Sequence, residues 1–202
     1  MSGMPVGAHR TGALITARVP SWLVTATDPL TALALRAQAG DDAAQAALVR
    51  GTQAEVWRFT AALVDPGAAD DLTQETFLRA FKALPAFEAR AGVRTWLLGI
   101  ARRTCADHLR AVVRRRRLDA RLAAQVWTDR PHHPDPAHRL GAADLLDRLS
   151  EERRTAFVLT QVLGLSYAEA AEVEEVPVGT IRSRVARARD ELVTAVAEAQ
   201  AS

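Results

Sequence analysis

The chain has 202 residues, of which 49% are hydrophobic and 25% charged, and its formal net charge is +2. This composition excludes a disordered or fibrous protein, and the single cysteine, Cys105, excludes an internal disulfide. No apolar run reaches the roughly 18 residues of a membrane span and no signal-peptide pattern is present, so we expect a cytoplasmic protein without membrane insertion. Abundant Ala and Leu favour an all-α fold.

Residues 1–27 have no periodicity and are predicted to form a mobile tail. From Pro29 onward a helical period begins, and it continues along a second helix that stops at residues 65–67. We expect a third helix over about 70–84, ended by Pro85, and a long fourth helix after a connection at 86–93. Together they predict one domain over residues 28–113. Its expected apolar positions are Leu48, Thr52, Val56, Phe59, Leu63, Leu72, Phe77, Leu78, Phe81, Trp96, Leu97, Ile100, Ala101, Thr104 and His108.

The periodicity fades between residues 114 and 139, where three prolines follow within six positions, so this stretch is predicted to be a linker. A second domain, residues 140–202, then carries helical stretches near 140–149, 151–163, 166–173 and 178–198. Ser166 followed by Glu169 predicts a capping box at the start of the third of these. The sequence therefore predicts two small helical domains joined by a linker.

The segment from Ser166 to Leu192 has the pattern of a short helix, a tight turn and a longer basic helix, typical of a helix-turn-helix. At 100° per residue, Ile181, Val185, Ala188 and Leu192 form one narrow apolar stripe. A solvated basic face is the alternative, but the capped helix and the tight turn in front favour DNA binding. The side chains opposite or flanking the stripe are Arg182, Ser183, Arg184, Ala186 and Arg187.

Two further segments differ sharply in charge. Residues 65–78 hold four acids and no base, whereas residues 102–121 hold eight arginines and two acids. Charge alone favours a solvated start for the acidic helix, although its mixed surface would also suit a basic partner protein. Arginines beside Trp96 suit single-stranded nucleic acid, which needs stacking and phosphate neutralisation, but Trp96 would serve equally as a core residue.

Taken in order, the segments DLTQETFLRAF, RTWLLGIARRTCADHLR and LTQVLGLSYAEAAEVEEVPVGTIRSRVARAR resemble the extracytoplasmic-function (group 4) sigma factors of bacterial RNA polymerase. The resemblance covers about residues 29–197. It implies that 28–113 is sigma region 2, that 140–202 is the helix-turn-helix region 4, and that the chain has no catalytic activity of its own. It further implies that the chain directs transcription initiation together with core RNA polymerase.

The resemblance also assigns partners to surfaces. The acidic helix would bind the β′ clamp helices of core polymerase, which also contacts sigma factors through its β subunit, with Asp71, Gln74, Glu75 and Phe77. The loop after Pro85 and the following helix would capture the single-stranded −10 element with Phe87, Arg90, Arg94, Trp96, Arg103 and Arg110. The basic helix would read the double-stranded −35 element with Arg182, Ser183, Ala186 and Arg187, with Arg184 on their flank.

Other interpretations stay open at this stage. A helix-turn-helix repressor or activator with an N-terminal sensing or dimerisation domain would have a similar C-terminal half. A nuclease would need a carboxylate or histidine cluster for metal ions, and the sequence shows none. We interpret His132, His133, Asp135 and His138 as solvated linker residues, and we expect no metal and no cofactor. An anti-sigma factor is a candidate partner, and regulation without one is equally open.

Overall fold

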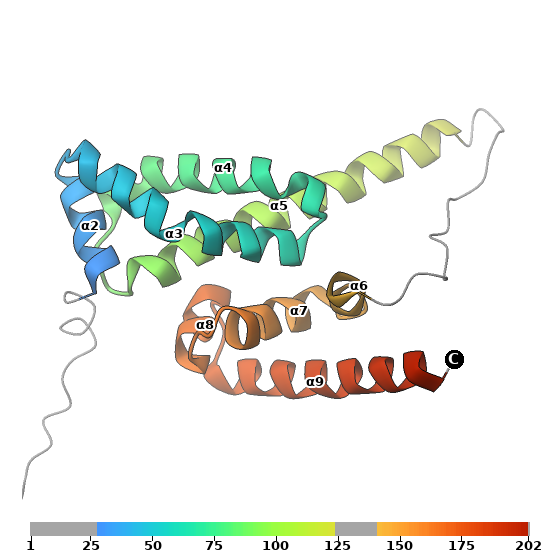
Figure 1. Ribbon diagram of the computed structural model, residues 1–202. Coiled ribbons are helices and arrows are strands. Elements are labelled where there is room, and N and C mark those ends of the chain that lie inside the picture. The colour runs from blue at the N-terminus through green and yellow to red at the C-terminus, as the bar shows by residue number, and fades with distance from the viewer. Residues whose placement is uncertain (1–27, 124–140, 202) are drawn as a thin grey trace, which may run out of the picture.

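The computed structural model describes residues 28–123 and 141–201, which are helical throughout apart from short connections (Figure 1). The predicted tail and most of the predicted linker, including the four residues considered as a metal cluster, lie outside the described residues. Within the described ranges no strand occurs, so the all-α prediction is confirmed. The N-terminal half consists of α2 (Pro29–Gln38), α3 (Asp42–Leu63), α4 (Pro66–Ala83), a 3₁₀ turn (Leu84–Ala86) and α5 (Val93–Ala123).

Three aspartates fix where the first helices begin. The carboxylates of Asp28, Asp41 and Asp65 accept hydrogen bonds from the first free backbone N–H groups of α2, α3 and α4. The apolar faces then meet around Phe59, which is fully buried. Leu78 was expected in this core but is 56% exposed. It lies six residues after buried Leu72, about 240° around the helix, and so faces solvent.

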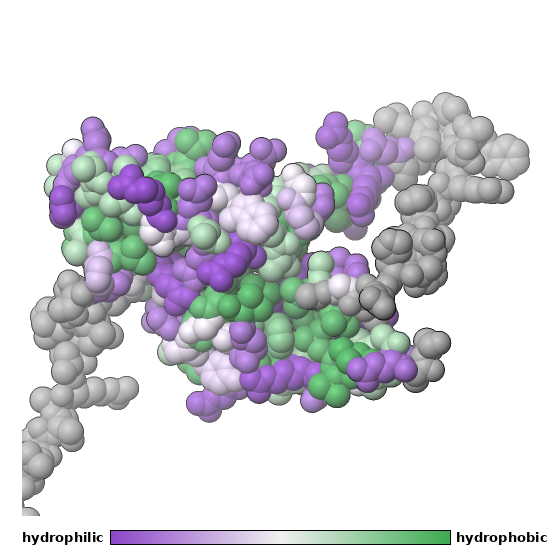
Figure 2. All heavy atoms as spheres, in the orientation of Figure 1, coloured by the Kyte–Doolittle hydropathy of each residue, from purple (hydrophilic) through white to green (hydrophobic). Residues whose placement is uncertain are grey.

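Helix α5 is longer than the sequence suggested. It continues to Ala123, through the stretch from residue 114 where we expected the linker to begin, because arginine is a good helix former even without an apolar stripe. Figure 1 shows this last part of α5 projecting past the other helices, and Figure 2 shows hydrophilic side chains grouped along it. No described helix is long and apolar enough to cross a membrane.

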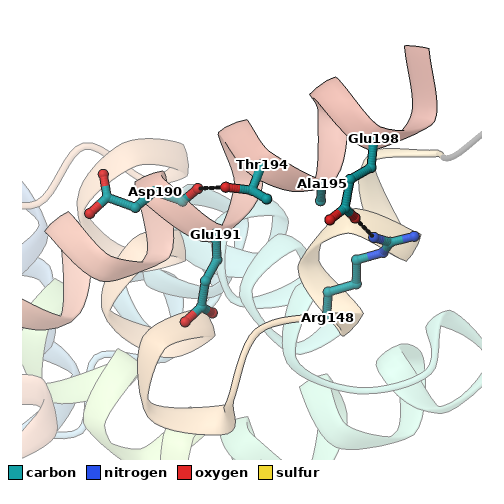
Figure 3. Close-up of a pocket in the computed structure, with 6 residues that line it drawn as sticks. All are labelled: Arg148, Asp190, Glu191, Thr194, Ala195 and Glu198. Carbon is teal, nitrogen blue, oxygen red and sulfur yellow. Dashed lines mark hydrogen bonds and ion pairs between the residues drawn. The ribbon is translucent and has the colours of Figure 1, made fainter. Parts of the chain in front are cut away.

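The C-terminal half consists of α6 (Ala142–Asp147), α7 (Glu151–Phe157) continued by a π-helical turn (Val158–Val162), α8 (Tyr167–Glu174) and α9 (Val178–Ala201). The predicted capping box is confirmed, since Ser166 N–H donates to Glu169 and Glu169 N–H donates back to Ser166 Oγ. The far half of α9 is tied to the end of α6 by an ion pair of 3.5 Å between Arg148 and Glu198 (Figure 3).

The two halves pack against each other along α5 and α8, and their buried apolar residues form one continuous core. Polar contacts also cross the boundary. Among them, Arg102 Nε donates to the carbonyl of Val173 at 3.0 Å, and Arg154 Nη1 donates to that of Leu63 at 3.5 Å. The first part of α5, which carries the predicted −10 residues Arg94, Trp96 and Arg103, therefore faces the helix-turn-helix (Figure 1).

Candidate functional site

Helix α9 turns one side into the C-terminal core and the other to solvent. Ile181, Val185 and Ala188 are buried, as the helical wheel predicted. The N-terminal part of the helix is free on its opposite side, so side chains there can reach into a major groove. These exposed side chains, called the recognition face below, are Arg182, Ser183, Ala186 and Arg187.

Arg184 differs from the recognition face. Its guanidinium is half-buried and forms an ion pair with Glu174 at the end of α8. Glu174 is only 8% exposed, and this burial raises the pKa of its carboxyl to about 7 although Arg184 and Arg102 pull it down. Arg184 therefore joins the two helices of the helix-turn-helix instead of pointing outward with its neighbours. The chain between them turns at Glu175, whose φ of 58° is left-handed.

One side chain, to which no sequence pattern pointed, holds the loop that leads into α5. The Gln38 amide lies within 2.9 to 3.1 Å of the carbonyl oxygens of Leu84, Pro85 and Phe87. Val93 N–H donates to Thr31 Oγ1 at 3.0 Å, which fixes the first turn of α5 to α2. Both contacts join residues more than 45 positions apart, so no local pattern could predict them.

Of the two aromatic residues predicted to meet the −10 element, only Trp96 is accessible. Phe87 is 6% exposed, and its ring centroid lies 4.9 Å from that of half-buried Trp96. At this distance the two rings support each other in a tilted contact. Phe87 therefore acts as the backing of Trp96 in this structure and is not itself presented to a ligand.

All four predicted −10 arginines make ion pairs. Arg90 pairs with Glu88 at 2.5 Å and Arg110 with Asp107 at 2.6 Å, both within the N-terminal half. Arg94 pairs with Glu55, which raises its pKa, and also donates to the carbonyl of Leu163 at 2.5 Å. Arg103 pairs with Glu175, in the turn of the helix-turn-helix, at 2.6 Å. Arg94 and Arg103 thus both contact residues of the C-terminal half. These contacts join distant parts of the sequence, so only the tertiary structure reveals them.

The acidic helix α4 borders a shallow groove against α3. The groove measures about 310 Å³, and its floor includes Phe77, which is only 8% exposed. Asp71 and Gln74 are exposed at this groove, whereas the Glu75 carboxylate forms an ion pair with Arg79 Nε at 2.7 Å. The lining residues are Val49, Gln53, Thr73, Gln74, Phe77, Leu78 and Phe81.

Two apolar residues that the sequence did not indicate as binding residues add to this surface. Leu78 lines the groove with its exposed side chain, and Trp57 is 41% exposed nearby while its Nε1 donates to Asp70 at 2.8 Å. The signal for Leu78 was its spacing, since it follows exposed Gln74 by one helical turn. An apolar groove bordered by acids and an accessible Trp is suited to a protein partner.

Arg79 links this surface to α5. It pairs with Glu75 on α4 and with Asp107 on α5 at 2.6 Å, and Asp107 also pairs with Arg110. The two arginines hold the pKa of the Asp107 carboxyl below its usual range.

Cys105 on the same helix is buried in the core, where burial raises the pKa of its thiol to about 12. Over the described ranges no group of three His, Cys, Asp or Glu could hold a metal ion.

Solved structures share this fold. The chain is similar to CnrH in its complex with the cytosolic domain of CnrY, with a TM-score of 0.63 and 24% identity over 83% of this chain and 96% of that one. It is also similar to the sigma factor RpoE of Bartonella quintana in complex with the anti-sigma factor NepR. That match has a TM-score of 0.55 and 28% identity, covering 71% of this chain and 91% of RpoE.

Sequence comparisons agree with the fold. Residues 48–117 match the family model of sigma-70 region 2, and residues 140–192 match that of sigma-70 region 4; neither describes an enzyme. The ECF RNA polymerase sigma factor SigC of Mycobacterium tuberculosis is 52% identical over 179 residues, which cover 84% of this chain and 93% of SigC. The ECF sigma-E factor of Haemophilus influenzae is 33% identical over 79% of this chain and 90% of its own length. The chain therefore belongs to the extracytoplasmic-function sigma factors, which direct RNA polymerase to promoters.

Proposed function

We propose that this sigma factor uses two surfaces to recognise the promoter and a third to bind core RNA polymerase. The recognition face of α9 reads a double-stranded −35 element, the start of α5 with Trp96 captures the single-stranded −10 element, and the groove between α3 and α4 binds core RNA polymerase. The observation that carries the proposal is the recognition face itself, an outward row of arginine and small side chains opposite a fully buried stripe. The chain acts in the cytoplasm, through the polymerase, without a cofactor or catalytic activity of its own.

For the −35 element, the N-terminal half of α9 enters the major groove. Arg182 and Arg187 can donate bidentate hydrogen bonds to guanine, and the methyl group of Ala186 can contact thymine. Arg187→Ala should weaken binding to the preferred sequence by about 1 to 3 kcal/mol relative to a mismatched one. Arg189→Ala is the matched control. Arg189 lies two positions after Arg187 and carries the same charge, but its guanidinium donates to the side chain of Gln161. Equal losses on all sequences would make Arg187 a phosphate contact.

For the −10 element, Trp96 offers a ring face on which an unstacked base can lie, and the arginines of α5 neutralise the phosphates beside it. DNA and the C-terminal half are then alternative partners for Arg94 and Arg103. The Arg103–Glu175 pair is exposed and contributes little stability, so a phosphate can replace the carboxylate readily. The two halves would have to move apart before both promoter elements are bound.

For the polymerase, the acidic edge of α4 attracts a basic helical surface, and Leu78 and Trp57 supply apolar contact. The β subunit would be the second point of contact on the core enzyme. Asp71→Arg combined with Glu75→Arg should abolish co-purification with core polymerase. The control pair Asp119→Arg with Glu172→Arg makes the same charge change on other exposed faces. Undiminished association of the first pair would remove the groove from the proposal.

The whole assignment is tested by run-off transcription with purified core RNA polymerase on a pool of genomic promoter fragments, followed by sequencing of the transcripts. Specific start sites that share motifs near −35 and −10 are the expected result. Binding to duplex fragments without any initiation would instead favour a helix-turn-helix repressor or activator. Because two related folds were solved with CnrY and with the anti-sigma factor NepR, we also propose an anti-sigma partner, detectable by co-purification from the native cell.

A further inference from the structure

One face of α5 carries three of the residues predicted to meet the −10 strand. At 100° per residue, Trp96, Arg103 and Arg110 lie within about 40° of one another, along roughly 21 Å of the helix. This row is called the −10 face below. Asp107 lies in the same row, about 20° from Trp96 on its other side. A carboxylate at this position would repel the phosphates of the strand unless neighbouring cations compensate its charge.

Two arginines compensate Asp107. Arg110 Nη2 donates to Oδ1 of the carboxylate at 2.6 Å, and Arg79 Nη1 donates to Oδ2, also at 2.6 Å. The two guanidinium groups therefore use different oxygens of one carboxylate. Arg79 belongs to α4 and lies 28 positions before Asp107, so no local pattern indicated it as a DNA-binding residue. The packing of α4 along α5 brings its side chain to the −10 face (Figure 1).

Stability does not account for this arrangement. The side chains of Arg79, Asp107 and Arg110 are 38%, 47% and 66% exposed, and exposed ion pairs contribute little to the free energy of unfolding. Arg79 Nε donates to Glu75, but its remaining N–H groups form no hydrogen bond within residues 28–123 and 141–201. Because arginine has five N–H donors in a planar fork, Arg79 can still donate to a phosphate while two carboxylates hold it.

We propose that Asp107 is a positioning residue of the −10 face, which holds Arg110 in place and draws Arg79 to the same surface as a further phosphate contact. The proposal rests on the proposed function, since it requires the −10 strand to bind along this face. Phosphate contacts fix the register of a nucleic acid without reading its bases. The two arginines would hold the strand in position while the ring of Trp96 receives an unstacked base.

Replacing Asp107 by asparagine separates positioning from charge. Asp107→Asn removes a negative charge from the −10 face, so charge alone predicts tighter binding of the strand. Positioning predicts the opposite, because the two arginines lose the ionised carboxylate that holds them and have to be ordered when the strand binds. Ordering a long side chain on binding weakens the affinity by about two- to tenfold.

The test measures binding of a fluorescent single-stranded oligonucleotide, with the −10 sequence found by run-off transcription, to the holoenzyme formed with core polymerase. We expect Asp107→Asn to weaken binding by about two- to tenfold. The matched control Asp119→Asn should not weaken it, because Asp119 is an exposed aspartate of the same helix without an ion pair among the described residues. When Arg79→Gln and Arg110→Gln are already present, Asp107→Asn should cause no further loss.

Salt dependence tests the phosphate contact itself. Arg79→Gln should lower the slope of log K against log salt by about 0.7, the value for one phosphate of a single strand. An unchanged slope would overturn this part of the proposal, and so would a loss of binding to core polymerase in Asp107→Asn, which would indicate a structural role.

Three other results would overturn the role of Asp107. They are tighter or unchanged binding in Asp107→Asn, an equal loss in Asp119→Asn, and an equal loss from Asp107→Asn when both arginines are already replaced. Unchanged binding in both Trp96→Ala and Arg110→Gln would instead refute the −10 site of the proposed function, and with it the surface that Asp107 is proposed to organise.

Discussion

Replacing Glu174 by glutamine should change how the stability of this protein depends on pH. Burial raises the pKa of the carboxyl from 4.5 to about 7. A carboxyl whose pKa is higher in the folded state binds its proton more tightly there, so its stabilising contribution is present below pH 4.5 and is lost as the pH rises through 7. The shift corresponds to a loss of up to about 3 kcal/mol. Glu174→Gln removes the titration and keeps an amide oxygen that can accept from Arg184.

The assay is urea unfolding of the full chain at several pH values between 5 and 8, followed by circular dichroism. The stability of the variant relative to the wild type should rise with pH across this range. The neighbouring change Glu175→Gln is the control. Arg103 lowers the pKa of the Glu175 carboxyl below its usual 4.5, so this group stays ionised over the assayed range and the stability difference between Glu175→Gln and wild type should change little between pH 5 and 8. A difference between Glu174→Gln and wild type that stays constant with pH would refute the argument that burial controls this carboxyl.

Three further substitutions test other parts of the structure. Gln38→Ala should weaken −10 single-strand binding while duplex binding at −35 is retained, because the amide holds the loop before α5; fluorescence anisotropy on both probes checks this. Glu175→Gly should raise the free energy of unfolding by about 0.5 to 1 kcal/mol and shift the urea midpoint upward accordingly, since glycine accepts a φ of 58° without strain. Phe59→Ala should destabilise the protein by about 3 to 5 kcal/mol in the same assay, because the ring is fully buried.

The helices themselves were predictable because their signals are local. The capping box at Ser166, the apolar stripe through Ile181 and Val185, and the composition that favours helix each depend on residues within a few turns of one another. The end of α5 was not predicted, because a run of arginines lacks the apolar period used to recognise helices, although it has good helix propensity.

The amino-acid sequence alone determined the all-α class, the two regions and the outward row of α9, since a helical period fixes which side of a helix is apolar without reference to the rest of the chain. Only the tertiary structure decided the partners of the charged and aromatic side chains. Arg184 pairs with Glu174, Arg103 with Glu175 some 72 residues away, and Phe87 is buried against Trp96. Such choices follow from the packing of whole helices against each other, which determines which side chains meet and which remain free to bind.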